Sequence, residues 1–237
     1  MIDAIVRHLS GLTFVLLVAA APAKLQAQNA ETRDAGKLVA EEKAPAGKPL
    51  PPQAAPQFSA ALYELRDAVY NNADPVRIEQ SAQALAGEAK TLGFDTIDEA
   101  LILARIEYLA ARSWNEAGNR QKAIPHFEAA IAQARRSMSV GEHAAGLMAL
   151  TKPLSELSLI KGMAFLIANG PQVNKNAKKI LLLEPGHIGA RITLAAEKAY
   201  PPAIFGGNPK EAIAQMTALI RAHPEGFEKD LLFDIRV

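Results

Sequence analysis

The residues best suited to nucleophilic chemistry are a serine and a lysine separated by about one helical turn. Ser158 and Lys161 form a Ser-x-x-Lys pattern. On one face of a helix, an unprotonated lysine at this spacing could accept the proton of the serine hydroxyl and so create a nucleophile. The same spacing arises easily by chance on any helix. We therefore expect catalysis from this pair only if further motifs accompany it.

Those further motifs are absent from the sequence. The Ser-Asp-Asn and Lys-Thr-Gly motifs that accompany Ser-x-x-Lys in penicillin-recognising enzymes do not occur, and neither does a Gly-x-Ser-x-Gly motif, a phosphate-binding loop or a dinucleotide-binding motif. No cysteine exists to complete a zinc site. The sequence predicts a protein that is not an enzyme and that holds no metal and no cofactor. The five histidines are isolated in the sequence: His8, His126, His143, His187 and His223.

One segment combines apolar residues with rigid turn residues. It runs from Tyr200 to Pro209 and reads Tyr-Pro-Pro-Ala-Ile-Phe-Gly-Gly-Asn-Pro. Apolar side chains are unusual on a connection between helices, and the prolines would hold one shape at little entropic cost. The segment either folds onto a neighbouring helix pair and fills its core, or edges a groove for a partner or an apolar ligand. The predicted binding residues are Tyr200, Pro202, Ile204, Phe205, Gly206 and Gly207.

The elements that position this segment are helices. Apolar residues recur with the helical period from Phe58 onward, and no stretch shows the sustained alternation of a strand. Asp74 and Pro75 predict an N-cap and a first helical residue, and Thr96 opens a capping-box pattern. We expect the single tryptophan, Trp114, to pack between paired helices. The predicted helices are 58–70, 75–92, 96–117, 120–138, a short one ending before Pro153, 154–168, 173–183, 188–199 and 209–222.

Helices of this length with short connections pair antiparallel, and the pairs repeat loosely. Ala123, Phe127 and Ala130 have the small–aromatic–small spacing of the second helix in a tetratricopeptide unit. Pro185 and Pro224, which follow two successive helix pairs, lie 39 residues apart. A standard unit has about 34 residues, so this one carries an insertion. We predict an all-α fold of antiparallel helix pairs stacked as a short α-α solenoid.

The inserted segment Tyr200–Pro209 resembles a loop found in a subset of bacterial tetratricopeptide proteins. In those proteins an apolar, proline-rich stretch and a Gly-Gly-Asp/Asn-Pro turn join the two helices of a unit. By similarity, the chain is identified as a degenerate, exported member of the tetratricopeptide superfamily. The resemblance is clearest over Ser155–Val237 and weaker over Ala100–Arg136.

Three regions follow from the composition. Residues 1–27 have an apolar run followed by small residues, which is typical of a secretory signal peptide cleaved near Ala27. Residues 28–57 are rich in Pro, Ala and Lys, which predicts a disordered tether, and residues 58–237 form the helical repeat domain. The last apolar stripe lacks a following helix, so it either caps the domain or belongs to an incomplete repeat. The predicted location is the periplasm or the exterior, without stable membrane insertion after cleavage.

The favoured function is that of a non-catalytic exported scaffold that binds another protein or a peptide segment of one. With 26 basic and 25 acidic residues, the chain is not expected to bind nucleic acid, and Lys175, Lys178 and Lys179 are expected to form a solvated helix face. The alternative rests on a resemblance to the T component of tripartite ATP-independent periplasmic transporters, which implies an apolar small-molecule ligand. A closed apolar cavity through the helices would distinguish that alternative. A purely structural role in the envelope is a third hypothesis.

Overall fold

The structure is a computed structural model that describes residues 55–199 and 207–222. These residues belong to one compact unit of the chain, Gly47–Ile235. The predicted signal peptide, nearly all of the predicted tether and the last apolar stripe lie outside the described residues.

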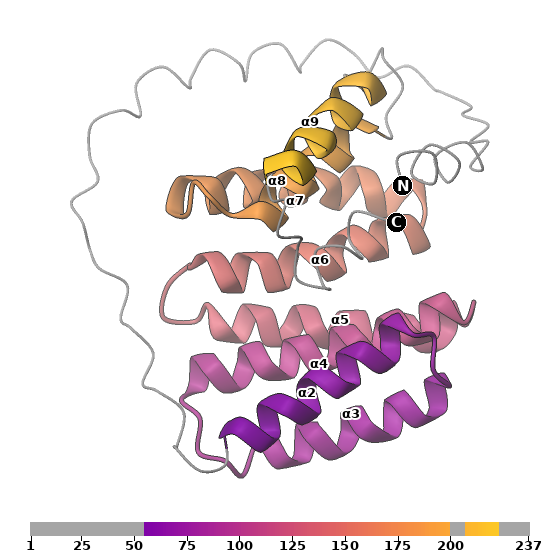
Figure 1. The fold of residues 1–237 in the computed structure, drawn as a ribbon, viewed down its shortest axis with the longest axis vertical. Helices are drawn as coiled ribbons and strands as arrows, with labels where there is room; N and C mark the ends of the chain where they lie inside the picture. Colours follow the sequence, from indigo (N-terminus) through magenta and orange to yellow (C-terminus); the bar gives the residue numbers. More distant parts are fainter. Residues whose placement is uncertain (1–54, 200–206, 223–237) are drawn as a thin grey trace. The chain divides into compact units, whose positions relative to one another are not determined.

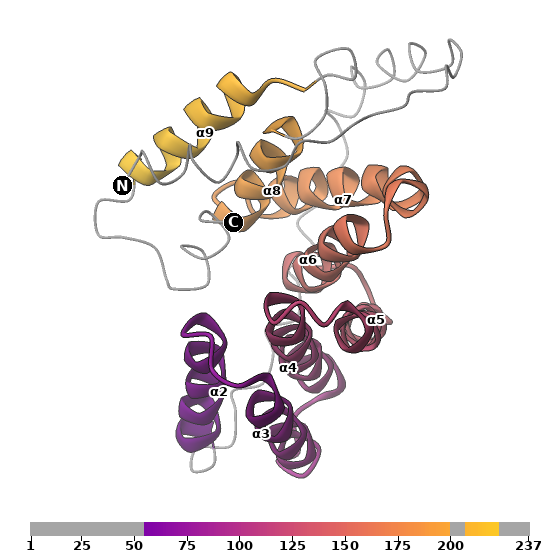
Figure 2. The ribbon, with the colours of Figure 1, turned by 90° about the vertical axis from the view of Figure 1, so that its right-hand side faces the viewer.

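The described residues form eight helices and no strand, which confirms the all-α prediction. Each helix packs against the next one in the sequence, and α4 with α5 makes the most extensive of these contacts (Figures 1 and 2). The starts of α4, α6 and α8 are further apart in sequence than the roughly 34 residues of a standard tetratricopeptide unit. The helices are α2 (Ala55–Tyr70), α3 (Pro75–Ala89), α4 (Thr96–Glu116), α5 (Arg120–Ser137), α6 (Ala144–Ile160), α7 (Met163–Leu183), α8 (Ile188–Ala199) and α9 (Pro209–Ala222).

Short-range signals place most helix starts. Asp74 caps α3, and its side chain accepts a hydrogen bond from the backbone N–H of Val76. The cap of α4 is one residue earlier than predicted, because the Asp95 carboxylate accepts from the N–H groups of Ile97 and Asp98, so that Thr96 is already helical. An aspartate one residue before a threonine is at least as good a cap, and here it takes that role.

The boundaries of α6 and α7 correct the sequence prediction. Pro153 lies inside α6 and Pro171 lies inside α7, where the sequence placed helix ends. The break falls instead at Gly162, whose φ of 85° is a left-handed conformation that glycine adopts without strain. A helix tolerates an internal proline when the burial of its apolar face outweighs the lost hydrogen bond, which costs about 3 kcal/mol. In α6 that buried face includes Leu147, Leu150, Leu154 and Leu157.

Successive clusters of buried side chains hold the helices together. One cluster spans α2, α3 and α4 and includes Leu103 and Ile106, whereas the next spans α4 to α7 and includes Trp114 and Phe127. Helix α4 therefore contributes to two cores, as expected for stacked pairs in which each layer buries a face of the layer before it. Trp114 packs between helices, as predicted from the sequence.

Candidate functional site

The sequence-predicted site lies almost entirely outside the described residues. Tyr200, Pro202, Ile204, Phe205 and Gly206 are not described, and Gly207 is half-exposed just before α9.

The described residues on either side of that segment are held together. The backbone N–H of Asn208 donates to the carbonyl of Lys198 at 2.7 Å, and the Asn208 side chain caps α9 by accepting from Glu211 N–H. The Lys198 ammonium pairs with the Glu211 carboxylate. At the end of α8, Glu197 accepts a hydrogen bond from Asn174 of α7. Asn208, Lys198 and Glu211 therefore fix where the inserted segment leaves and rejoins the helices.

Ser158 and Lys161 have separate partners. The Ser158 hydroxyl is buried and donates to the Leu154 carbonyl at 2.8 Å. The Lys161 ammonium forms an ion pair with Glu128 of α5 and lies 5.2 Å from the centre of the Phe165 ring. The serine hydroxyl is thus engaged in a backbone hydrogen bond and the lysine side chain in an ion pair with another helix. This arrangement does not activate the serine as a nucleophile.

Two of the histidines that looked isolated in sequence cap helices. The Nδ1 atom of His143 accepts a hydrogen bond from Gly146 N–H at the start of α6, at 3.1 Å. His187 makes the equivalent bond with Ala190 N–H at the start of α8, at 3.2 Å. Both rings therefore act as acceptors for the free N–H groups of a helix N-terminus.

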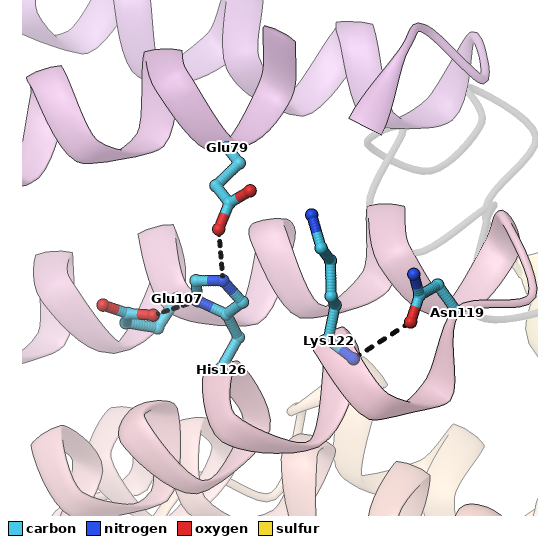
Figure 3. A network of polar contacts seen from close by, with 5 residues as sticks. All are labelled: Glu79, Glu107, Asn119, Lys122 and His126. Carbon is cyan, nitrogen blue, oxygen red and sulfur yellow. Dashed lines mark hydrogen bonds and ion pairs between the residues drawn. The ribbon is translucent and has the colours of Figure 1, made fainter. Parts of the chain in front are cut away.

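The His126 side chain contacts two other helices, which the sequence did not predict. Its Nδ1 is 2.7 Å from a carboxylate oxygen of Glu107, and its Nε2 is 3.3 Å from one of Glu79 (Figure 3). The three residues come from α5, α4 and α3. Since a carboxylate can only accept, the ring satisfies both neighbours when both nitrogens carry a proton. The hydrogen bond to Glu107 is the main cause that raises the pKa of His126, and burial acts in the opposite direction.

We call the contacts of the His126 ring with Glu79 and Glu107 the clasp. Within the described ranges, no group of three or more His, Asp or Glu side chains is arranged to hold a metal ion. In Figure 3, Lys122 rises from α5 toward the same side as His126, one turn earlier. The Lys122 ammonium lies 3.8 Å from the centre of the Trp114 ring and makes a cation–π contact with it. The cluster therefore joins three helices electrostatically.

The clasp predicts a pH dependence of stability. Because the pKa of His126 is raised in the folded state, its contribution is complete below the unfolded value of about 6.5 and is lost as pH rises through the folded value. We expect His126→Gln to cost about 1 kcal/mol at pH 5.5 and less at pH 9. Urea denaturation of both proteins across this range measures it, with His187→Gln as the control, because the His187 ring caps α8 through a backbone N–H. A cost that grew with pH would contradict the protonated clasp.

A group of three neighbouring exposed apolar residues lies on α7. Met163, Leu166 and Ile167 share one face at i, i+3 and i+4, and all three are exposed, with Ile167 at 70%. Phe165, between them, turns inward and packs against the core that α4 to α7 share. We call Met163, Leu166 and Ile167 the α7 apolar face. Leu159, near the end of α6, is also exposed, at 57%.

The α7 apolar face belongs to an uncharged stretch. No Asp, Glu, Lys or Arg occurs from Met163 to Asn174, which is more than half of the helix. Other exposed apolar residues include Val140, alone in the turn before α6, and the adjacent Leu182 and Leu183 at the far end of α7. A single exposed residue such as Val140 is normal, whereas neighbouring ones mark interaction surfaces. No helix in the described part of the chain is long and apolar enough to cross a membrane.

Two hollows on the described helices are open to solvent. One of about 380 Å³ lies at the turn between α4 and α5 and is lined by residues 117–121. The other, of about 440 Å³, follows α7 and is lined by Pro171, Asn174, Lys175, Lys178, Lys179 and Leu182. Neither has the enclosed form that the apolar-ligand alternative calls for.

Comparison of the chain with family models, with curated proteins and with solved structures found no match. The described residues define only a fold class, which is an all-α array of successively packed helices with an exposed apolar face on α7.

Proposed function

We propose that this protein is an exported, non-catalytic helical scaffold of tetratricopeptide type that binds another protein. One observation carries the proposal, which is the exposed and uncharged α7 apolar face. Covering Met163, Leu166 and Ile167 with a partner would remove their side chains from water, and this is the main source of free energy at the centre of a protein interface. Export and repeat type rest on the sequence patterns described above.

The rigidity of the surrounding helices supports this role. Helix α7 packs against α6 and α8 through Val173, Ala177 and Ile180, all of which are buried. The Asn174 side chain adds a polar contact by donating to Glu197 of α8. A surface that is already ordered loses little conformational entropy when a partner binds. The α7 apolar face is therefore suited to bind without rearrangement of the scaffold.

A photo-crosslinking amino acid placed at residue 167 tests the proposal. In envelope extract, we expect it to capture one discrete protein, whose crosslinked peptide is then identified by mass spectrometry. The same amino acid at residue 140 is the control, because Val140 is also a highly exposed apolar residue, at 79%, but lies in the turn before α6 and not on α7. Equal capture at both positions, or none at 167, would contradict the proposal.

Ile167→Asp should then weaken binding of the identified partner by at least about thirtyfold. The substitution would bury a carboxylate against an apolar partner surface, and central interface residues typically contribute 2 kcal/mol or more. Isothermal titration calorimetry measures the effect, with Val140→Asp as the matched control. Because Ile167 is exposed, the thermal unfolding midpoint should stay the same in both variants. A similar affinity for the two variants would place the interface elsewhere.

A further inference from the structure

Among the described residues, a single side-chain hydrogen bond links helix α3 to another helix, and it is that of Glu79 with His126. Lysine and arginine ion pairs join later helices, and these cations keep their charge to about pH 10. Of these links, that of α3 alone depends on a side chain that titrates near neutral pH. The ion pairs are Arg136 with Glu99 (α5 to α4), Arg112 with Glu156 (α4 to α6), Lys161 with Glu128 (the end of α6 to α5) and Lys198 with Glu211 (α8 to α9).

Helices α2 and α3 are held mainly through α4. Their buried side chains form one cluster with Leu103, Ile106 and Leu109 of α4, and no buried residue of α5 belongs to this cluster (Figure 2). The cluster that α4 shares with α5, α6 and α7 is a separate one. A segment with its own cluster opens without the rest of the protein, at a lower free-energy cost than global unfolding. Release of α2 and α3 would leave the second cluster intact.

From this arrangement we infer that α2 and α3 form a pH-sensitive segment, whose opening from α4 is suppressed while His126 is protonated. A protonated ring donates to Glu79 and Glu107 at once. After the loss of one proton, the ring donates to one carboxylate, and its other nitrogen meets the second carboxylate as acceptor against acceptor. The contact with Glu107 is the shorter one, at 2.7 Å against 3.3 Å for Glu79. The link to α3 is therefore the one that we expect to be lost.

The charged groups that face the ring come from three helices. From α3 it faces Glu79, from α4 it faces Glu107, and on α5 itself Lys122 lies one turn earlier with its ammonium against Trp114 (Figure 3). Within the described residues, no charged side chain of α6 contacts the ring. Because the hydrogen bond to Glu107 is the main cause that raises the pKa of His126, the clasp is complete below about pH 6.5 and is lost as pH rises through the folded-state value.

The experiment makes use of the chain's lack of cysteine. A single introduced cysteine reports opening through its rate of labelling by a thiol reagent, corrected for thiolate formation with an unfolded peptide of the same local sequence. Ala82→Cys is the α3 reporter, since Ala82 is 4% exposed, and Ala177→Cys is the α7 reporter, since Ala177 is fully buried. Ala89→Cys, at another fully buried position of α3, replaces the first reporter if Ala82→Cys does not fold.

We expect the α3 reporter to be labelled at least about tenfold faster than the α7 reporter, because α3 opens without the whole protein. Between pH 6 and pH 9 its corrected rate should rise about fivefold, which corresponds to the loss of one hydrogen bond between partly exposed charged groups. Its rate should also depend less on urea than that of the α7 reporter, because opening α2 and α3 exposes less surface than global unfolding.

Two histidine variants assign the effect to the clasp. His126→Gln should remove the rise of the α3 rate with pH, because an amide does not titrate. His187→Gln should keep the rise, because that ring caps α8 through a backbone N–H. The α7 apolar face is not part of this segment, so crosslinking from residue 167 tests the proposed function separately.

Three results would overturn the inference. Equal labelling rates at the α3 and α7 reporters would show that the helices open only together. An α3 rate that stays constant between pH 6 and pH 9 would show that His126 does not control the opening. A rise with pH that persists in His126→Gln would assign the pH dependence to another group.

Discussion

Arg112→Met is expected to lower the free energy of unfolding by about 3 kcal/mol or more. The Arg112 side chain on α4 is only 4% exposed and donates to Glu156 of α6 and to Glu116. Burial alone would lower the pKa of Arg112, but Tyr108, Glu156 and Glu116 raise it overall, so the guanidinium stays charged. The variant would leave the largely buried Glu156 carboxylate without this cation, and removing one partner of a buried pair typically costs 3–5 kcal/mol.

Two further variants separate this effect from simple loss of volume. Glu116→Gln removes a partner that is 39% exposed and should cost no more than about 0.5 kcal/mol. Arg112→Met with Glu156→Leu removes both charges and should recover most of the loss, because a buried ion pair is often replaceable by apolar side chains. Urea denaturation at pH 7 measures all three. A cost below about 1 kcal/mol for Arg112→Met would show that this pair does not hold α4 to α6.

Phe127→Ala is expected to cost about 3–5 kcal/mol. The Phe127 side chain is fully buried, with its ring centre 5.9 Å from that of Tyr108 on α4. It belongs to the cluster that joins α4 and α5 to α6 and α7, so the variant leaves a cavity where two helix pairs meet. Phe127→Leu keeps most of the volume and should cost about 1 kcal/mol.

The comparison of these two variants gives the test. Chemical denaturation followed by circular dichroism gives the difference between them, and Val140→Ala, at an exposed turn, should be nearly neutral. If Phe127→Ala and Phe127→Leu lowered the free energy of unfolding equally, the loss would come from strain around the new side chain and not from a cavity. That result would contradict the cavity explanation.

Local patterns predicted the elements that depend on neighbouring residues. The start of α3 followed from Asp74 and Pro75, and the bounds of α8 and α9 were predicted as the structure has them. Ala123, Phe127 and Ala130, chosen for their spacing, are all fully buried. In each case the signal and the structure lie within one or two helical turns, so no knowledge of distant residues was needed.

Prediction from the sequence was wrong or incomplete where an interaction with distant residues outweighs a local preference. The prolines of α6 and α7 carry the local signal of a helix end, and the packing of buried apolar residues outweighs it. These are leucines in α6 and Val173, Ala177 and Ile180 in α7. In the clasp, His126 lies 47 positions from Glu79 and 19 positions from Glu107. Residues so far apart are not brought together by the spacing within one helix. Only the pairing of α3, α4 and α5 brings them together.

The sequence by itself determined the helical class and the stripes, because helix formation depends on the period of apolar residues and on caps a few residues away. It did not determine which stripe would be covered. Met163, Leu166 and Ile167 have the same pattern as the buried residues of α6, yet no described helix packs over them. Burial depends on which surface another element reaches, and that is a property of the tertiary structure. The candidate binding surface therefore became visible only when the helices were placed in space.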